Sequence, residues 1–440
     1  MDTRYAIRVD LYKTDKETTR MQPDASGGQQ LLKSINRMAL VRHLCVHPGL
    51  SRADLALEVG LTKSTITSLV RELIAEGWLM ESSVVATGDL GRRPTPLFIS
   101  PDRLLMLGAE VGIDGVRVVA TTLTGEVRAR AVSAYGASRS AKACLGVLAT
   151  VLLKVRAQLD PSQRIIGIGV GLPGGVDEAR GVLNFAPNLG WHDLAVGQLL
   201  SEKLDGGPLS GIPLYLQNEA DVAALGEMEF NAGAPADPLL YLSINQGVGA
   251  GVIVGDRLLT GARGFAGEIG HMILQIDGPL CSCGRRGCAE ALIGMRAMLR
   301  PDEAAELGPH SLPDIRGRLV DGDRKTAKAV ESAGRYLGVL LQNLATAYDP
   351  ACIVLGGSVV ELGDAFLDPA LTTLNDYATA AGLSPTPVRT SRFGADAVAA
   401  GAAALARHRV TRPQLPTIGV GRANATAPAD SEGQDQEAAL

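Results

Sequence analysis

The feature that most constrains this chain is the stretch DGPLCSCGRRGCAEALIG, residues 277–294. It places three cysteines within eight residues: Cys281, Cys283 and Cys288. Glycines at 284 and 287 allow the backbone turns that bring three thiols onto one tight loop. The other three cysteines lie singly in apolar surroundings, where we expect core positions. They are Cys45, Cys144 and Cys352.

The chain has no segment that predicts export or membrane insertion. Its first thirty residues mix charged and apolar residues and contain no hydrophobic signal core. No window reaches the length of a transmembrane helix. We therefore expect a cytoplasmic protein that binds no membrane, in a compartment where thiols stay reduced. A disulfide is the weaker explanation of the cysteine cluster.

Length and charge divide the chain into a head and a body. At 440 residues, two or three domains are expected. The net charge is −5, yet the first hundred residues hold thirteen Lys and Arg against eleven Asp and Glu. The remaining 340 residues carry more Asp and Glu than Lys and Arg, so their net charge is negative. A mildly basic head on an acidic body is typical of a small DNA-binding module fused to another domain.

The pattern of a helix-turn-helix runs from Leu50 to Met80. Ser51 followed by Asp54 predicts a capping box and a helix start, Gly60 predicts the turn, and Thr62 caps a second helix. An earlier helix, QQLLKSINRMALVRHLCV, would complete the bundle. One face of the second helix has apolar residues at helical spacing. The residues of that stripe are Ile66, Leu69, Val70, Leu73 and Ile74.

The opposite face of this second helix is polar, as in a recognition helix that meets base edges and phosphates. Its residues are Lys63, Ser64, Thr67, Ser68 and Arg71. Residues 78–100 then predict a β-hairpin with Arg92 and Arg93 at its tip, where they can reach the DNA backbone or minor groove. The alternative is a generic three-helix bundle with a solvated basic loop. The order of all these features favours a winged helix that binds DNA.

From about Leu104 the pattern changes to that of an α/β protein. Two strand-turn-strand segments with glycine-rich turns begin at residues 104 and 239. Within RIIGIGVGLPGGVD, Arg164–Asp177, and within DPACIVLGGSVV, a buried strand runs into a glycine turn, and a strand enters a helix at Asn218 and Glu219. A long helix is expected over Asp323–Asp349. Polar residues at strand ends are where α/β folds place ligands.

These blocks resemble the ROK family of repressors, uncharacterised reading frames and sugar kinases. The residues GEIGHMILQIDGPLCSCGRRGCAE, 267–290, resemble its signature very closely, and FAPNLGW, NEADVAALGE and DPACIVLGGS resemble its other blocks in order. The winged head with this body is similar to the ROK repressors for xylose and N-acetylglucosamine. The resemblance covers roughly residues 30–408. It implies a winged helix-turn-helix followed by a two-lobed, actin-like ATPase (RNase H-like) domain, with sugar between the lobes.

The resemblance also indicates what the cysteines do, and the chemistry agrees. With His271 as fourth ligand, the three cysteines form a Cys3His set, which suits a closed, structural Zn2+ site. The alternative is three reduced thiols in a loop. The sugar contacts that the resemblance implies lie beside this cluster. They are Asn188, Asn218, Glu219, Glu268, His271 and Glu290.

Three departures from the kinase pattern predict that the body is not an enzyme. ROK kinases use an Asp as general base after the Asn of the NE pair, whereas this chain has Glu219, which displaces the carboxylate. The first phosphate turn carries Asp114 in place of a Thr, and the second carries Gln246. The adenosine-side turn, residues 356–358, is nearest to intact. We therefore expect Glu219 to be vestigial and ATP use to be lost or nearly lost.

Two functions remain at this point. The first is a sugar-responsive transcriptional repressor that binds operator DNA and a monosaccharide such as xylose. The second is a ROK sugar kinase, phosphorylating a hexose with ATP, that carries a DNA-binding head. A remote third is an adaptor that binds another protein. Paired DNA-binding heads on a two-fold site predict a homodimer or higher homo-oligomer.

The expected domains follow from these patterns. They are a flexible leader over 1–28, a winged helix-turn-helix over 29–100, a ROK domain over 101–408 and a disordered tail over 409–440.

Overall fold

A computed structural model of the chain describes residues 25–82, 95–231, 236–261, 266–300, 303–306 and 311–413. One compact unit spans Arg37–Arg412, and the first turns of helix α1 precede it. The described part of the head consists of a helical bundle and a short antiparallel hairpin. Its elements are α1 (Ala25–Val46), α2 (Arg52–Val59), α3 (Lys63–Ala75), β1 (Leu79–Glu81) and β2 (Leu97–Ile99).

The helix ends in the head are those that the sequence predicts. The side chains of Ser51 and Asp54 form the capping box of α2, which ends at Gly60 with φ at +72°. Thr62 caps α3 by accepting a hydrogen bond from the Thr65 amide. The first four members of the predicted apolar stripe are fully or almost fully buried, and Ile74 is half-buried. The tip of the hairpin, with Arg92 and Arg93, lies outside the described residues.

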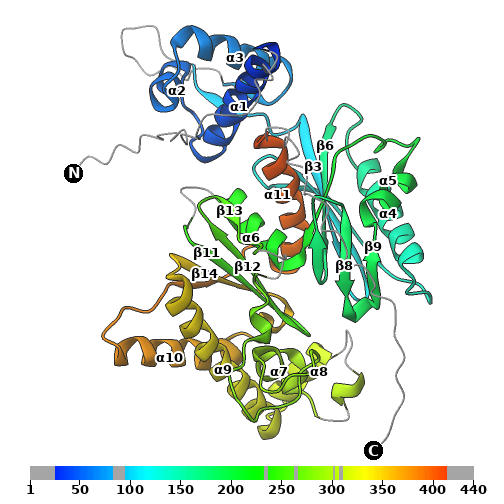
Figure 1. Cartoon of the computed structure of the whole chain (residues 1–440), viewed down its shortest axis with the longest axis vertical. Helices are drawn as coiled ribbons and strands as arrows, with labels where there is room; N and C mark the ends of the chain where they lie inside the picture. Colours follow the sequence, from blue (N-terminus) through cyan, green and yellow to red (C-terminus); the bar gives the residue numbers. More distant parts are fainter. Residues whose placement is uncertain are drawn as a thin grey trace, which may run out of the picture. The chain divides into compact units, whose positions relative to one another are not determined.

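Two five-stranded sheets of similar design form the body (Figure 1). The first has the order β10-β6-β3-β4-β5, with an antiparallel β3–β4 hairpin and parallel partners β6 and β10. Its strands are β3 (Leu104–Val111), β4 (Gly115–Thr122), β5 (Val127–Ala134), β6 (Arg164–Leu172) and β10 (Leu214–Asn218). A small antiparallel sheet follows β6. Its strands are β7 (Gly175–Asp177), β8 (Val182–Ala186) and β9 (Trp191–Leu194).

The second sheet repeats this plan with the order β13-β12-β11-β14-β15. Its strands are β11 (Leu239–Ile244), β12 (Val248–Val254), β13 (Arg257–Leu258), β14 (Cys352–Gly356) and β15 (Val388–Thr390). Apolar residues of this sheet share a core with four helices that lie between β13 and β15 in sequence. Those helices are α7 (Ala289–Ile293), α8 (Ser311–Val320), α9 (Arg324–Tyr348) and α10 (Asp364–Ala380). The expected α/β architecture and the long helix at α9 are both confirmed.

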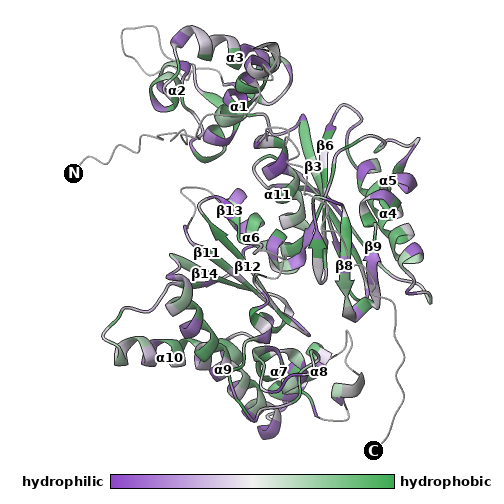
Figure 2. Cartoon of the chain, viewed as in Figure 1, coloured by the Kyte–Doolittle hydropathy of each residue, from purple (hydrophilic) through white to green (hydrophobic). Residues whose placement is uncertain are grey.

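Helices cover both faces of the first sheet. One face packs against α4 (Ala141–Ala157) and α5 (Val196–Leu204). The other packs against α11 (Ala397–Thr411), which lies directly on β3 and β6 (Figure 1). This contact is close, because a Cβ placed on Gly169 would lie 1.8 Å from the Ala402 carbonyl oxygen. Figure 2 shows the hydrophobic colour along β3 and β6, as expected for strands covered on both faces.

Helix α6 (Glu219–Glu229) connects the two sheets. It follows β10 of the first sheet directly and packs against β11 and β12 of the second as well as against α11. Every residue of α6 after Glu219 is buried. Helix α6 therefore begins at a strand end where the sequence places ligand residues and then runs through the interior. None of the described helices combines the length and apolar character needed to cross a membrane.

Candidate functional site

The predicted DNA-contacting face of α3 is exposed. All five of its predicted contact residues lie on the outside of the helix. They are Lys63, Ser64, Thr67, Ser68 and Arg71. The Thr67 hydroxyl donates to the Lys63 carbonyl oxygen at 2.7 Å, whereas the described contacts include no acidic partner for Arg71. The face is thus available to a phosphate backbone and to base edges.

Asn218 lies at the junction of β10 and α6 and is held by backbone groups. Its Oδ1 accepts from the amides of Ala220 (2.8 Å) and Asp221 (3.4 Å), which caps the helix. Its Nδ2 donates to the Gly174 carbonyl oxygen at 2.8 Å. An amide has two N–H donors, so one remains for a ligand. The sequence predicted a sugar contact here and missed the capping role.

Asn188 makes no side-chain hydrogen bond with any of the residues that the structure describes. It is exposed on a short 3-10 turn, Pro187–Leu189, between β8 and β9. Gly174, which binds Asn218, packs against the backbone of Phe185 and Ala186, just before that turn. Its predicted role as a sugar contact stays a prediction.

The Cys3His set comes together in the structure. Its four donor atoms all lie within 4.8 Å of one another: those of His271, Cys281, Cys283 and Cys288. The Sγ atoms of Cys283 and Cys288 are 3.7 Å apart, and Cys281 Sγ is 3.6 Å from His271 Nδ1. A tetrahedral site with Zn–S bonds of about 2.3 Å has edges of about 3.8 Å, so the spacing fits a zinc ion. The described cysteines form no disulfide.

His271 joins the cysteine cluster to the predicted sugar residues. Its Nδ1 faces Cys281, while its Nε2 lies 4.0 Å from a carboxylate oxygen of Glu268. Glu290, in the first turn of α7, accepts a hydrogen bond from the Ser282 hydroxyl at 2.6 Å and from the Cys281 thiol at 3.6 Å. The cluster therefore fixes one histidine and one carboxylate of the predicted site. Sequence reasoning passed over Ser282, although its place between two cysteines was a signal.

The first turn of α6 carries two carboxyl groups whose environment favours the neutral form. Burial and the neighbouring carboxylate of Glu110 raise the pKa of Glu219 to about 7. Burial, followed by the charges of Glu268 and Glu178, raises the pKa of Asp221 to about 8. Asp221 is 7% exposed, and its carboxyl group forms no hydrogen bond with any of the described residues. Because the charge of Glu268 contributes to this raised pKa, Asp221 is a further candidate for the site that the sequence analysis missed.

The turn between β3 and β4 is tied down by ion pairs. Arg117 lies 3.5 Å from a Glu110 carboxylate oxygen and donates to Asp396 at 3.1 Å. Asp114 lies 3.6 Å from an Arg139 guanidinium nitrogen, and Arg139 also donates to the Ile113 carbonyl oxygen. The protein's own cations thus neutralise the acids at this turn.

The turn between β11 and β12 binds the glycine turn after β14. Asn245 Oδ1 accepts from both the amide (2.7 Å) and the hydroxyl (3.1 Å) of Ser358. The Asn245 amide donates to the Gly247 carbonyl oxygen at 2.8 Å, and its carbonyl oxygen accepts from the Met295 amide. Polar groups of the second predicted phosphate turn, at Asn245, and of the predicted adenosine-side turn, at Ser358, are therefore bonded to each other.

Comparison with known proteins agrees with both parts of this architecture. The model of the ROK family matches residues 106–409, and that of a winged helix-turn-helix DNA-binding domain matches residues 34–80. The xylose repressor of Bacillus subtilis (strain 168) is 32% identical over 336 residues, which cover 76% of this chain and 84% of that protein.

Solved structures show the same likeness. A ROK family transcriptional regulator, described as a homolog of the E. coli MLC protein, has a TM-score of 0.69 at 26% identity, over 87% of this chain and 97% of that one. A ROK family glucokinase from Streptomyces griseus, solved with glucose and AMPPNP, has a TM-score of 0.58 at 27% identity, over 69% of this chain and all of that one. The chain therefore belongs to the ROK family and carries an N-terminal winged helix-turn-helix.

Proposed function

We propose that this protein is a sugar-responsive transcriptional repressor. The observation that carries the proposal is the union, in one chain, of an exposed polar recognition helix with a ligand set built from carboxylates, amides and an imidazole. The similarity to xylose repressors and to an Mlc-like regulator supports the same reading. Xylose is the first sugar to test, because several relatives are named xylose repressors.

In the proposed site, the sugar hydroxyls are bound by Glu268, His271 and Glu290, by the free N–H of Asn218, and by Asn188 and Glu219. Carboxylates accept from adjacent hydroxyls, whereas an imidazole or an amide can donate. A Zn2+ ion in the Cys3His set would serve as a structural brace. It would be held by His271 and the three cysteines, and it would keep His271 oriented through Nδ1.

Regulation in this proposal follows from differential affinity. The sugar can release the protein from its operator only if it binds the released arrangement more tightly than the DNA-bound one. Paired heads on a two-fold operator would make the working protein a homodimer or larger homo-oligomer. On DNA, the face of α3 would enter the major groove, and Arg92 and Arg93 would follow the adjacent backbone.

We further propose that the body does not act as a kinase. Glu219 is a longer acid than the base of ROK kinases and is held close to Glu110. Ser358 is engaged by Asn245, and Asp114 places a carboxylate on the first turn. The alternative of an active sugar kinase has the glucokinase relatives in its favour.

The experiment that separates the two functions uses the full, zinc-loaded chain. Xylose and a panel of hexoses, amino sugars and sugar phosphates are screened by thermal shift. Each sugar is then tested for release of the intergenic DNA upstream of the gene and for sugar-dependent ADP formation from ATP. The repressor proposal expects a sugar that stabilises the protein and lowers DNA affinity without ADP formation. Sugar-dependent ADP formation would establish the kinase instead.

A further inference from the structure

Helices α6 and α11 cross with their backbones in contact. A Cβ placed on Gly401 of α11 would lie 2.1 Å from the Val222 carbonyl oxygen of α6. A Cβ on Gly226 of α6 would lie 3.0 Å from the Gly401 Cα. No layer of side chains separates the two helices at this point, so neither can shift along the other without a clash. This close contact couples the position of one helix to that of the other.

Helix α6 begins at the candidate effector site, by which we mean the predicted sugar residues, and α11 begins at the ion pairs of the β3–β4 turn. Asn218 caps α6, and the first turn of α6 carries Glu219 and Asp221. At the start of α11, Asp396 accepts from Arg117 at 3.1 Å and lies 3.2 Å from Arg130. An eleven-residue helix is about 16 Å long, so α6 carries a displacement at this end well into the interior.

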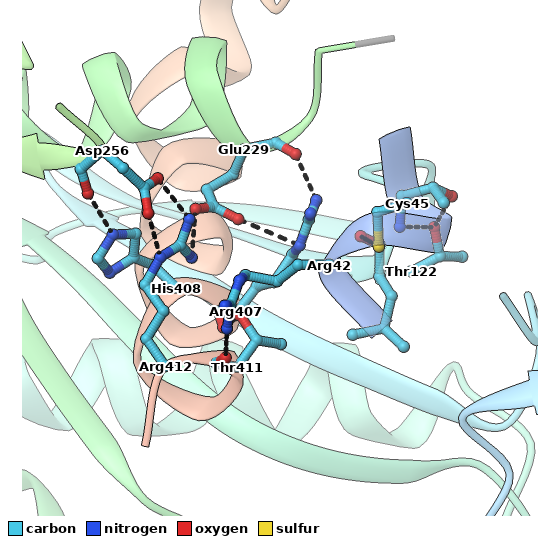
Figure 3. A network of polar contacts seen from close by, with 11 residues as sticks. Arg42, Cys45, Thr122, Glu229, Asp256, Arg407, His408, Thr411 and Arg412 are labelled. Atoms are coloured by element: carbon cyan, nitrogen blue, oxygen red, sulfur yellow. Dashed lines mark hydrogen bonds and ion pairs between the residues drawn. The ribbon is translucent and has the colours of Figure 1, made fainter. Parts of the chain in front are cut away.

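Both helices also end at one cluster of charges (Figure 3). The Glu229 carboxylate, at the end of α6, lies 3.2 Å from Arg407 and 2.7 Å from Arg412. Arg407 donates as well to the Glu229 carbonyl oxygen. Arg412 binds the two carboxylate oxygens of Asp256 at 2.6 and 2.8 Å. The side chains of Glu229 and Arg407 are 2% and 4% exposed, so this ion pair is buried, whereas Asp256 at the edge of the cluster is 54% exposed.

The head is joined to this cluster through α1. The Arg42 guanidinium donates to the carbonyl oxygen of Thr411, the last residue of α11 (Figure 3). Three residues further on, the Cys45 thiol lies 4.0 Å from the Leu123 carbonyl oxygen. The fully buried side chains of α1 between and before them share an apolar core with Leu123 and Phe230. They are Leu40, Val41 and Leu44. We call Arg42, Glu229, Asp256, Arg407, Thr411 and Arg412 the head–body junction.

The charges of the head–body junction are unequal. Three guanidinium groups face two carboxylates, and burial followed by the charge of Arg412 lowers the pKa of Arg42. Burial likewise lowers the pKa of His408, which leaves its ring neutral near pH 7 while Nε2 lies 3.3 Å from the Asp256 carbonyl oxygen. Buried ion pairs add little net stability compared with apolar side chains of the same size, and their best-documented use is to set register or to switch. If the head–body junction served only stability, we would expect apolar side chains there, as in the core beside it.

We propose that α6 and α11 transmit the state of the effector site to the head–body junction, where Arg42 on the Thr411 carbonyl oxygen sets the orientation of the DNA-binding head. This inference rests on the proposed function and adds its route of regulation. A sugar that draws Glu268 and the first turn of α6 together displaces the α6–α11 pair, and the displacement reaches Arg42. By thermodynamic linkage, DNA bound to the head weakens sugar binding by the same factor.

The test measures coupling in two variants and one matched control of the full chain. Arg42→Met removes the contact with α11, and Glu229→Gln removes the charge at the end of α6. Arg37→Met is the control, because Arg37 lies on the same helix but pairs with Glu76 inside the head. Affinity for the intergenic DNA is measured by fluorescence anisotropy with and without saturating xylose. Xylose affinity is measured by calorimetry without DNA.

In the wild type, xylose is expected to weaken DNA binding by about tenfold or more, within the usual range of allosteric coupling. In Arg42→Met and Glu229→Gln, xylose should weaken DNA binding by less than about threefold. The xylose affinity and the DNA affinity without sugar should each stay within about threefold of the wild-type values. Arg37→Met should keep the wild-type factor. An unchanged factor in both junction variants would overturn the proposal and leave the repressor function standing. A wild type whose DNA binding ignores xylose would refute the proposed function itself.

Because Glu229→Gln alters a buried cluster and can impair folding, a second measurement uses the wild type alone. Hydrogen exchange is followed at residues 37–46 and 405–412 with and without xylose, in the absence of DNA. Xylose should change the exchange rates of both segments together with those of α6. Bound xylose that protects only the effector site would contradict transmission to the junction.

Discussion

At the scale of single residues, the site depends on side chains that serve two partners. His271 faces Cys281 with one ring nitrogen and Glu268 with the other, so the candidate metal ligands and the proposed sugar residues share a side chain. Asn218 caps α6 and keeps one donor in reserve. These contacts within the protein hold the candidate ligand residues in place before a ligand binds. Fewer side chains then lose conformational freedom on binding, which lowers its entropic cost.

Glu268→Gln should weaken xylose binding by about tenfold to a hundredfold, because a hydrogen bond to a charged group contributes about 1.5–3 kcal/mol. Calorimetry on the zinc-loaded protein gives the affinity. Glu202→Gln, an exposed position on α5, is the matched control and should leave the affinity unchanged. Equal affinities in the two variants would place the sugar elsewhere.

Asp221→Asn should change the pH dependence of stability. The folded pKa of Asp221 is about 8, above the unfolded value of about 4, so the folded state holds the extra proton between these limits. Wild-type stability from this group is therefore full below pH 4 and is lost as the pH rises to 8. Relative to the wild type, the free energy of unfolding of the Asn variant should rise by on the order of a few kcal/mol between pH 5 and pH 8, as measured by urea denaturation. A stability difference that does not vary with pH would refute the raised pKa.

At the scale of elements, the local signals of the head were readable and the packing of the body was not. Ser51, Gly60 and Thr62 set helix ends through groups a few residues apart, so the sequence predicted them correctly. Helices α6 and α11 cross where Gly226 meets Gly401, two residues that are far apart in the sequence. Arg407 and Glu229, which join the ends of the same helices, are 178 positions apart. No local pattern announces that Gly226 and Gly401 meet.

Arg71→Ala should reduce DNA affinity and lower the slope of log affinity against log salt by about one, the loss of one phosphate contact. Anisotropy titrations over a range of salt concentrations provide the slope. Arg128→Ala on β5 of the body is the control and should leave the slope as in the wild type. A slope unaltered in Arg71→Ala would remove this residue from the interface.

Gly401→Ala should destabilise the protein by about 1–3 kcal/mol, since the added methyl group would meet the Val222 carbonyl oxygen. Gly146→Ala in α4 has open space around the new Cβ and should instead stabilise the chain by up to about 1 kcal/mol. Thermal or urea unfolding compares the two. The same sign of change in both would contradict the close crossing.

At the scale of the whole molecule, each of the two similar sheets of the body contributes one of the turns that the sequence compared with phosphate-binding turns. The polar groups of both turns are bound to other groups of the protein. Arg117 and Arg139 bind the acids of the first, and Asn245 binds Ser358 beside the second. Together with the winged head, this favours a protein that reads a sugar and passes the information on over one that transforms it. The family contains both kinds, so the kinase assay remains the direct test.

Metal removal should affect the whole body. Purified protein is expected to contain about one zinc ion per chain, and a chelator should lower the melting temperature and weaken xylose binding because His271 loses its brace. Cys283→Ser should reproduce both effects. Metal analysis with thermal unfolding measures them, and a folded, zinc-free chain with full xylose affinity would refute the metal site.

The sequence by itself determined the α/β class, the helix caps of the head and the grouping of the three cysteines, because these follow from short-range patterns. The two-lobed fold and the carboxylates around the cysteines came from its resemblance to the ROK family. Only the tertiary structure decided that Asp221 lies near Glu268, that Arg117 ties Glu110 to Asp396, and that Arg42 reaches the end of α11. These contacts join distant segments through burial and charge. Their energies depend on what surrounds each group, and that is settled only when the whole chain has packed.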